Sequence, residues 1–175
     1  MDFNQSYFEI FQIETSYDVD LDKLSVDYRA LQMSVHPDKF VSATDYEKRL
    51  SVQWAAQVNA AYDTLKSPLQ RAIYLLKLND KEIEHNPKLD PMFLMEQIEL
   101  REELEALEAS GEESLPGLDK FKAQITALLG QLEKSFADQM SQQALEESEQ
   151  TVYKMQFIHK LLLEANQLEE KLLDY

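Results

Sequence analysis

Apolar side chains recur every three or four positions along most of the chain, which is the period of an amphipathic helix. In the first 78 residues this pattern predicts four helical segments, at about 7–11, 20–35, 44–65 and 68–76. Asp20 and Ser67 are residue types that cap helix N-termini, and Pro68 suits the first position of a helix. Because Pro37 disfavours helical geometry at His36, the second segment is expected to end there.

The remaining chain predicts three longer helices. Asp90 and Pro91 repeat the cap and proline pattern, open a helix to about residue 109, and precede an expected turn at 110–117. Ser141 is expected to cap a last helix that ends near residue 173. The middle helix carries an apolar stripe of Leu118, Phe121, Ile125, Leu128, Leu132 and Phe136. Long helices with short connections predict an antiparallel three-helix bundle, and since no strand pattern is present, the fold class is all-α.

Residues 79–89 separate these two groups of helices. The stretch is polar, contains Pro87 and shows no apolar period. It is therefore interpreted as a linker between an N-terminal domain at 1–78 and a C-terminal bundle at 90–175.

Charge and composition exclude several classes of function. The chain has 17 basic and 33 acidic residues, a net charge of −16, which argues against nucleic-acid binding and against docking on an anionic membrane. The absence of cysteine excludes disulfides and thiolate metal sites. No stretch approaches the roughly 18 apolar residues of a membrane span. The N-terminus lacks the pattern of a secretory signal, so a cytoplasmic protein is expected.

The acidic excess is concentrated in the second half of the chain. Residues 1–80 hold 12 acidic and 8 basic residues, whereas residues 81–175 hold 21 and 9. This change in charge falls in the polar stretch at 79–91, which supports a boundary between two helical domains.

The tripeptide His36-Pro37-Asp38 lies between two predicted helices. Pro37 fixes its own φ and holds His36 extended, so the polar side chains are presented on a stiff turn. An ordinary helix-breaking loop is the alternative interpretation.

The context of this loop resembles the J-domain of DnaJ-type co-chaperones over residues 1 to about 78. The matching features are the aromatic cluster, the helix, the loop, and then Asn59-Ala-Ala-Tyr-Asp-Thr-Leu65, Pro68, Arg71-Ala72 and Tyr74. The resemblance implies that His36, Pro37 and Asp38 dock on a DnaK-type ATPase chaperone and stimulate its ATP hydrolysis. Lys39 and Arg29 are expected to support this contact.

The helix before the loop departs from that family, in which it is usually rich in Lys and Arg. Residues 21–35 contain only Lys23 and Arg29, against Asp22 and Asp27. Electrostatic steering toward an acidic groove is therefore expected to be weak, with more of the contact made by the loop, Lys39 and nearby basic residues.

The helix that begins at Pro91 has two apolar faces when it is projected at 100° per residue. Phe93, Leu100, Leu104 and Leu107 form a core stripe, and Leu94, Met95 and Ile98 lie roughly opposite, among Glu99, Glu102 and Glu105. A second apolar patch fringed by carboxylates is typical of a partner-binding surface. The alternative is that the short helix at 68–76 or the linker covers it. Tyr153 and Phe157 could extend the patch or belong to the core.

Three segments resemble the HscB family, the J-domain co-chaperones of iron–sulfur cluster assembly. They are Phe93-Leu-Met-Glu-Gln-Ile-Glu-Leu-Arg-Glu-Glu-Leu104, Gln167-Leu-Glu-Glu-Lys-Leu-Leu-Asp-Tyr175 and His36-Pro-Asp-Lys-Phe40. The resemblance implies that the bundle holds the scaffold protein IscU and brings it to the chaperone HscA. The family's scaffold-binding positions fall on Leu94, Met95, Ile98, Glu99, Glu102 and Phe157. Ala106 stands where relatives place a further acidic residue.

An enzyme is the competing hypothesis from the residues alone. Glu82 and His85 have the spacing of one half of a di-iron site, but His159 has Gln156 where the second Glu should be. No catalytic residue, metal site or cofactor is therefore expected. A general J-domain adaptor with a different client remains the alternative function.

Overall fold

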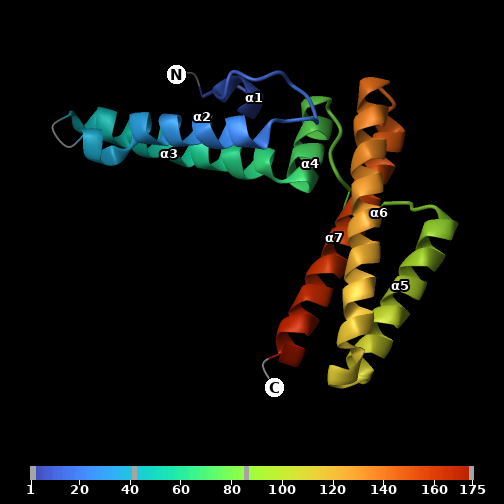
Figure 1. The fold of residues 1–175 in the computed structure, drawn as a ribbon. Helices are drawn as coiled ribbons and strands as arrows, with labels where there is room; N and C mark the ends of the chain where they lie inside the picture. The colour runs from blue at the N-terminus through green and yellow to red at the C-terminus, as the bar shows by residue number, and fades with distance from the viewer. Residues whose placement is uncertain (1–2, 41–42, 85–86, 174–175) are drawn as a thin grey trace. The chain divides into compact units, whose positions relative to one another are not determined.

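Helices α2 (Leu21–Val35) and α3 (Asp45–Lys66) form an antiparallel hairpin in the N-terminal part of the chain (Figure 1). The computed structural model describes residues 3–40, 43–84 and 87–173. By its internal contacts the chain divides into two units, Met1–Asn79 and Asp80–Tyr175. The described residues contain helices and no strand, which confirms the all-α prediction.

The first unit also contains α1 (Tyr7–Ile10), the 3₁₀ turn η1 (Pro37–Phe40) and α4 (Pro68–Leu78). The Asp20 side chain accepts the Lys23 N–H at 2.9 Å, and Ser67 caps α4 directly before Pro68, both as predicted. Each of these bonds satisfies a backbone donor that the helix itself leaves unpaired.

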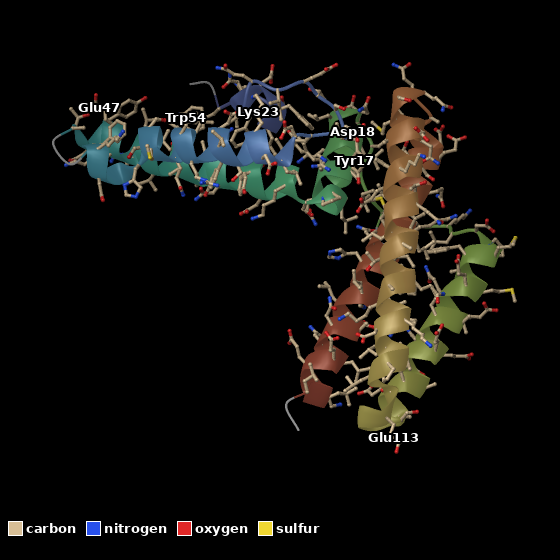
Figure 2. All side chains as sticks on the ribbon, viewed as in Figure 1. Tyr17, Asp18, Lys23, Glu47, Trp54 and Glu113 are labelled. Atoms are coloured by element: carbon tan, nitrogen blue, oxygen red, sulfur yellow. The ribbon has the colours of Figure 1, made fainter. Side chains whose placement is uncertain are left out.

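The core of this unit lies between the hairpin, α1 and α4. Its buried residues include Phe8, Leu24, Val35, Trp54, Val58, Ala61, Leu65, Ala72 and Leu76. Trp54, labelled in Figure 2, stacks on Phe3 with 4.0 Å between the ring centroids. Tyr74 stacks on Tyr7, and its hydroxyl accepts the Tyr7 N–H at 2.9 Å. The N-terminal segment is thereby held against the hairpin that carries the loop.

The second unit contains α5 (Pro91–Ala109), the 3₁₀ turn η2 (Gly111–Ser114), α6 (Leu115–Ser141) and α7 (Leu145–Leu173). Helices α6 and α7 pair along their length, and α5 packs against both (Figure 1). Their shared core is made by Leu100, Leu104, Leu118, Phe121, Ile125, Ile158, Leu161, Ala165 and Leu168. This arrangement is the three-helix bundle that the sequence predicts.

Two details of the second unit differ from the prediction. The expected turn at 110–117 is shorter, because α6 begins at Leu115 with a proline in its first turn. Ser141 does not cap the last helix: α6 continues through it, and its hydroxyl donates to the Asp138 carbonyl at 2.7 Å. The chain reverses after it, where Gln143 adopts a left-handed φ of 57°.

The segment between Asn79 and α5 makes contacts within the second unit. The Glu84 N–H donates to the Tyr153 hydroxyl at 2.9 Å, and Lys81 lies 3.3 Å from a carboxylate oxygen of Glu146. At least part of the predicted linker is therefore attached to α7.

Candidate functional site

The docking loop, defined here as residues 36–39, follows directly from the end of α2. His36 is extended, with φ −60° and ψ 129°, and the backbone then forms η1. The Lys39 N–H donates to the His36 carbonyl at 3.0 Å and closes this turn. A proline in the first position of η1 thus ends α2 and turns the chain within four residues.

The polar groups of the docking loop face solvent. The Asp38 N–H donates to Nδ1 of His36 at 3.3 Å, and that same nitrogen lies 3.5 Å from the Asp38 carboxylate. The Asp38 side chain is 86% exposed and is therefore available to a cationic partner group.

The structure brings only some of the predicted chaperone-binding residues together. His36, Asp38 and Lys39 line one shallow hollow, which Gln32 and Met33 of α2 complete. Arg29 does not line it; its guanidinium donates to the Ser25 hydroxyl at 3.1 Å on the exposed surface of α2.

The solvent face of α2 carries exposed apolar side chains. Val26 is 63% exposed and Met33 is 65% exposed, and a spacing of seven residues places them on the same side of the helix. The Lys23 ammonium is paired with the Asp27 carboxylate at 2.7 Å, which leaves it less available to a carboxylate of a partner. Val26 and Met33 were not predicted as contact residues, although their spacing could have indicated them.

The α5 face comprises Leu94, Met95, Ile98, Glu99 and Glu102. Its three apolar side chains are 43%, 64% and 58% exposed in chain order, and both glutamates are exposed. The opposite stripe of Phe93, Leu100 and Leu104 is buried. This exposure confirms the helical projection within the second unit, and no described residue of that unit covers the patch.

The two aromatic residues near this face behave differently. Phe157 is partly buried, and its ring meets Phe93 edge-on with 5.9 Å between centroids. Tyr153 is buried, and its hydroxyl donates to Glu149 at 2.8 Å. Burial raises the pKa of this phenol, although the Glu84 N–H acts in the opposite direction. Tyr153 is therefore a core residue, whereas Phe157 supports the rim of the α5 face.

Met92 is a residue of this region that the sequence analysis missed. It is 78% exposed, one position before the buried Phe93. Its spacing of three from Met95 places it on the neighbouring side of α5 and could have indicated it.

The structure offers no metal site among the residues it describes. Within 3–40, 43–84 and 87–173, no three His, Asp or Glu side chains gather in a way that could hold an ion. Glu82 and His85 are the pair with the spacing of half a di-iron site; His85 lies outside these ranges, and His159 is half-buried on α7.

In the described helices, no segment is both long and apolar enough to cross a bilayer.

Known proteins resemble this chain over nearly all of its length. Residues 89–166, which include α5, α6 and most of α7, match the family described as the HSCB C-terminal oligomerisation domain. The co-chaperone protein HscB homolog of Aliivibrio fischeri (strain MJ11) is 41% identical over 170 residues, which cover 96% of this chain and 99% of that protein. The homolog of Colwellia psychrerythraea is 41% identical over 174 residues, with 97% and 99% covered.

Solved structures of HscB proteins are similar to this chain as well. Chaperone HscB from Vibrio cholerae is similar with a TM-score of 0.87 and 38% identity, covering 96% of this chain and 99% of that one. Human co-chaperone protein HscB has a TM-score of 0.87 and 29% identity, covering 95% and 83%. From these similarities and the two helical units, the chain belongs to the HscB family of co-chaperones.

Proposed function

We propose that this chain is an adaptor in iron–sulfur cluster assembly, with one docking surface for each of two partners. The docking loop engages a DnaK-type ATPase chaperone, HscA, and stimulates its ATP hydrolysis. The α5 face holds the cluster scaffold protein, IscU, and delivers it to that chaperone. The chain itself breaks no bond in this scheme and uses no cofactor.

The observation that carries the proposal is the exposure of both surfaces in one chain. The Asp38 carboxylate is 86% exposed in the first unit, and the apolar residues of the α5 face are exposed in the second. Each surface has the chemistry of a contact site and lacks that of an active site, since one offers a charged acceptor and the other an apolar area.

Stimulation is expected to come from differential binding. A loop that contacts the hydrolysis-competent state of the ATPase better than its resting state shifts the population toward that state. The closed turn around Asp38 contributes because its geometry is set before the partner arrives, which lowers the entropic cost of docking.

Scaffold binding is expected to come from the burial of apolar surface. Leu94, Met95 and Ile98 lie on one side of a continuous helix and can bury their side chains in a partner's pocket. Glu99 and Glu102 fringe the apolar centre and favour a basic partner surface.

The decisive experiment is a steady-state ATPase assay of purified HscA with this chain, with and without IscU. The expected result is stimulation by this chain alone and a larger stimulation when both are present. Stimulation without any effect of IscU would favour a general J-domain adaptor with another client. No stimulation under either condition would contradict the proposal.

A further inference from the structure

A groove lies beside the α5 face, near the N-terminal end of α5. It is lined by Asp90, Met92, Met95, Glu96, Glu99 and Lys154, with Phe93 below them. Met95 and Glu99 belong both to this α5 groove and to the α5 face. The two features therefore adjoin and share part of their surface.

The apolar part of the α5 groove is accessible and adaptable. Met92 is 78% exposed and Met95 is 64% exposed, whereas the neighbouring Phe93 is 4% exposed. Unbranched thioether side chains repack easily around a partner group, and they contribute contact area without fixing one shape.

The charge of the α5 groove is predominantly negative. Three carboxylates line it against one ammonium, that of Lys154, which lies 5.3 Å from the centre of the Phe93 ring. The Asp90 carboxylate accepts the Met92 N–H at 2.9 Å and is partly committed to capping the helix. Among the described residues, Glu96 and Glu99 form no ion pair, so both carboxylates can meet a cation of a partner.

We propose that the α5 groove is a second contact site for the same scaffold protein. It receives an apolar side chain of the scaffold that is flanked by Lys or Arg. The apolar side chain packs on Met92 and Met95, and the cation approaches Glu96 and Glu99. This inference rests on the proposed function, and it makes Met92 a specificity-determining residue outside the α5 face.

The first test is the affinity of the full chain for purified IscU by isothermal titration calorimetry. Met92→Ala is expected to weaken binding roughly fivefold, as truncation of a contact residue does. Leu163→Ala is the matched control, since Leu163 is 49% exposed on α7 and does not line the groove. Leu94→Ala reports separately on the α5 face.

The second test fixes the sign of the charge in the occupant. Lys154→Met keeps the aliphatic stem near Phe93 and removes the ammonium. The variant is expected to bind IscU about two- to threefold more tightly at low salt, because the cation of the scaffold no longer meets a like charge. Unchanged or weaker binding would overturn the assignment of a cationic occupant.

The outcomes distinguish failure of the α5 groove from failure of the proposed function. If Leu94→Ala weakens binding and Met92→Ala behaves like Leu163→Ala, the α5 groove is not a contact site, and the proposed function stands. If the unaltered chain does not bind IscU at all, the proposed function itself fails. The circular dichroism spectrum of each variant must match that of the unaltered chain. If Met92→Ala does not fold, Met92→Gln, which keeps the length of the side chain, takes its place.

Discussion

The docking loop presents polar groups on a turn that the backbone closes, whereas the α5 face presents apolar side chains on an uninterrupted helix. In the docking loop, the exposed negative charge is a single carboxylate, that of Asp38. On the α5 face, the contact area is shared among Leu94, Met95 and Ile98. A change of a single group should therefore disable the first surface, while the second should lose affinity in steps.

The largest expected effect comes from Asp38→Asn. The substitution keeps the shape of the side chain and removes its charge, which costs about 2 kcal/mol or more at a charged contact. Stimulation of the HscA ATPase should be lost, and the affinity for IscU should be unchanged. Loss of both activities would show that the two surfaces are not independent.

The next effect concerns the α5 face. Replacing Leu94, Met95 and Ile98 together by Ala should weaken IscU binding by about 1–2 kcal/mol for each residue that acts as an anchor. Because all three side chains are exposed, the thermal midpoint by circular dichroism should move little. Phe157→Ala should instead lower that midpoint, since it removes the edge-on contact with Phe93. A large drop for the triple variant would make these residues part of the core.

A smaller effect is expected from salt. The exposed side of α2 carries Val26 and Met33, Lys23 is paired with Asp27, and Arg29 is the remaining cation of that helix. Apolar contact is not screened, so stimulation of HscA should change less than about twofold between 50 and 200 mM salt. Met33→Glu should reduce stimulation, whereas Val52→Glu, at an exposed position of α3, should not. A steep salt dependence would contradict this prediction and indicate that charged groups dominate the docking.

The smallest effect concerns the N-terminal cap of α3, the second helix of the hairpin. Glu47, labelled in Figure 2, accepts the Thr44 N–H at 2.9 Å and the Thr44 hydroxyl at 2.8 Å, and these bonds lower the pKa of its carboxyl below the ordinary value. The capping contribution is therefore full above the ordinary pKa and is lost as the pH falls through the lowered one. The protection factors of amides in the first turn of α3, corrected for the intrinsic exchange rate at each pH, should fall in that acidic range. Glu47→Gln should remove this pH dependence.

The helix starts could be predicted where a cap and a proline mark them. Asp20, Ser67 and Asp90 all cap the helices expected of them. Ser141 was predicted to cap the last helix, and this prediction was wrong because the turn depends on Gln143 in the left-handed conformation. Non-glycine residues adopt this conformation rarely, so the residue type at this position does not predict it. A serine near a helix end is then equally able to donate back into its own helix.

The exposure of the α5 face could also be predicted, since helical periodicity alone separates it from Phe93 and Leu100. The environment of Tyr153 could not, because its partner Glu84 is 69 positions away in sequence. Met92 was missed because the groove that it lines is completed by Lys154 of α7, which the periodicity of α5 does not show. Which partners bind remains a prediction at both surfaces.

The distribution of methionine has a practical consequence. Met33 lies beside the docking loop, Met92 and Met95 lie on α5, and Met155 is fully buried. Dilute hydrogen peroxide converts an accessible thioether to its sulfoxide much faster than an inaccessible one. Mass spectrometry of the peptides can therefore serve as a footprint, with Met155 as the internal standard. Addition of HscA should protect Met33, and addition of IscU should protect Met92 and Met95.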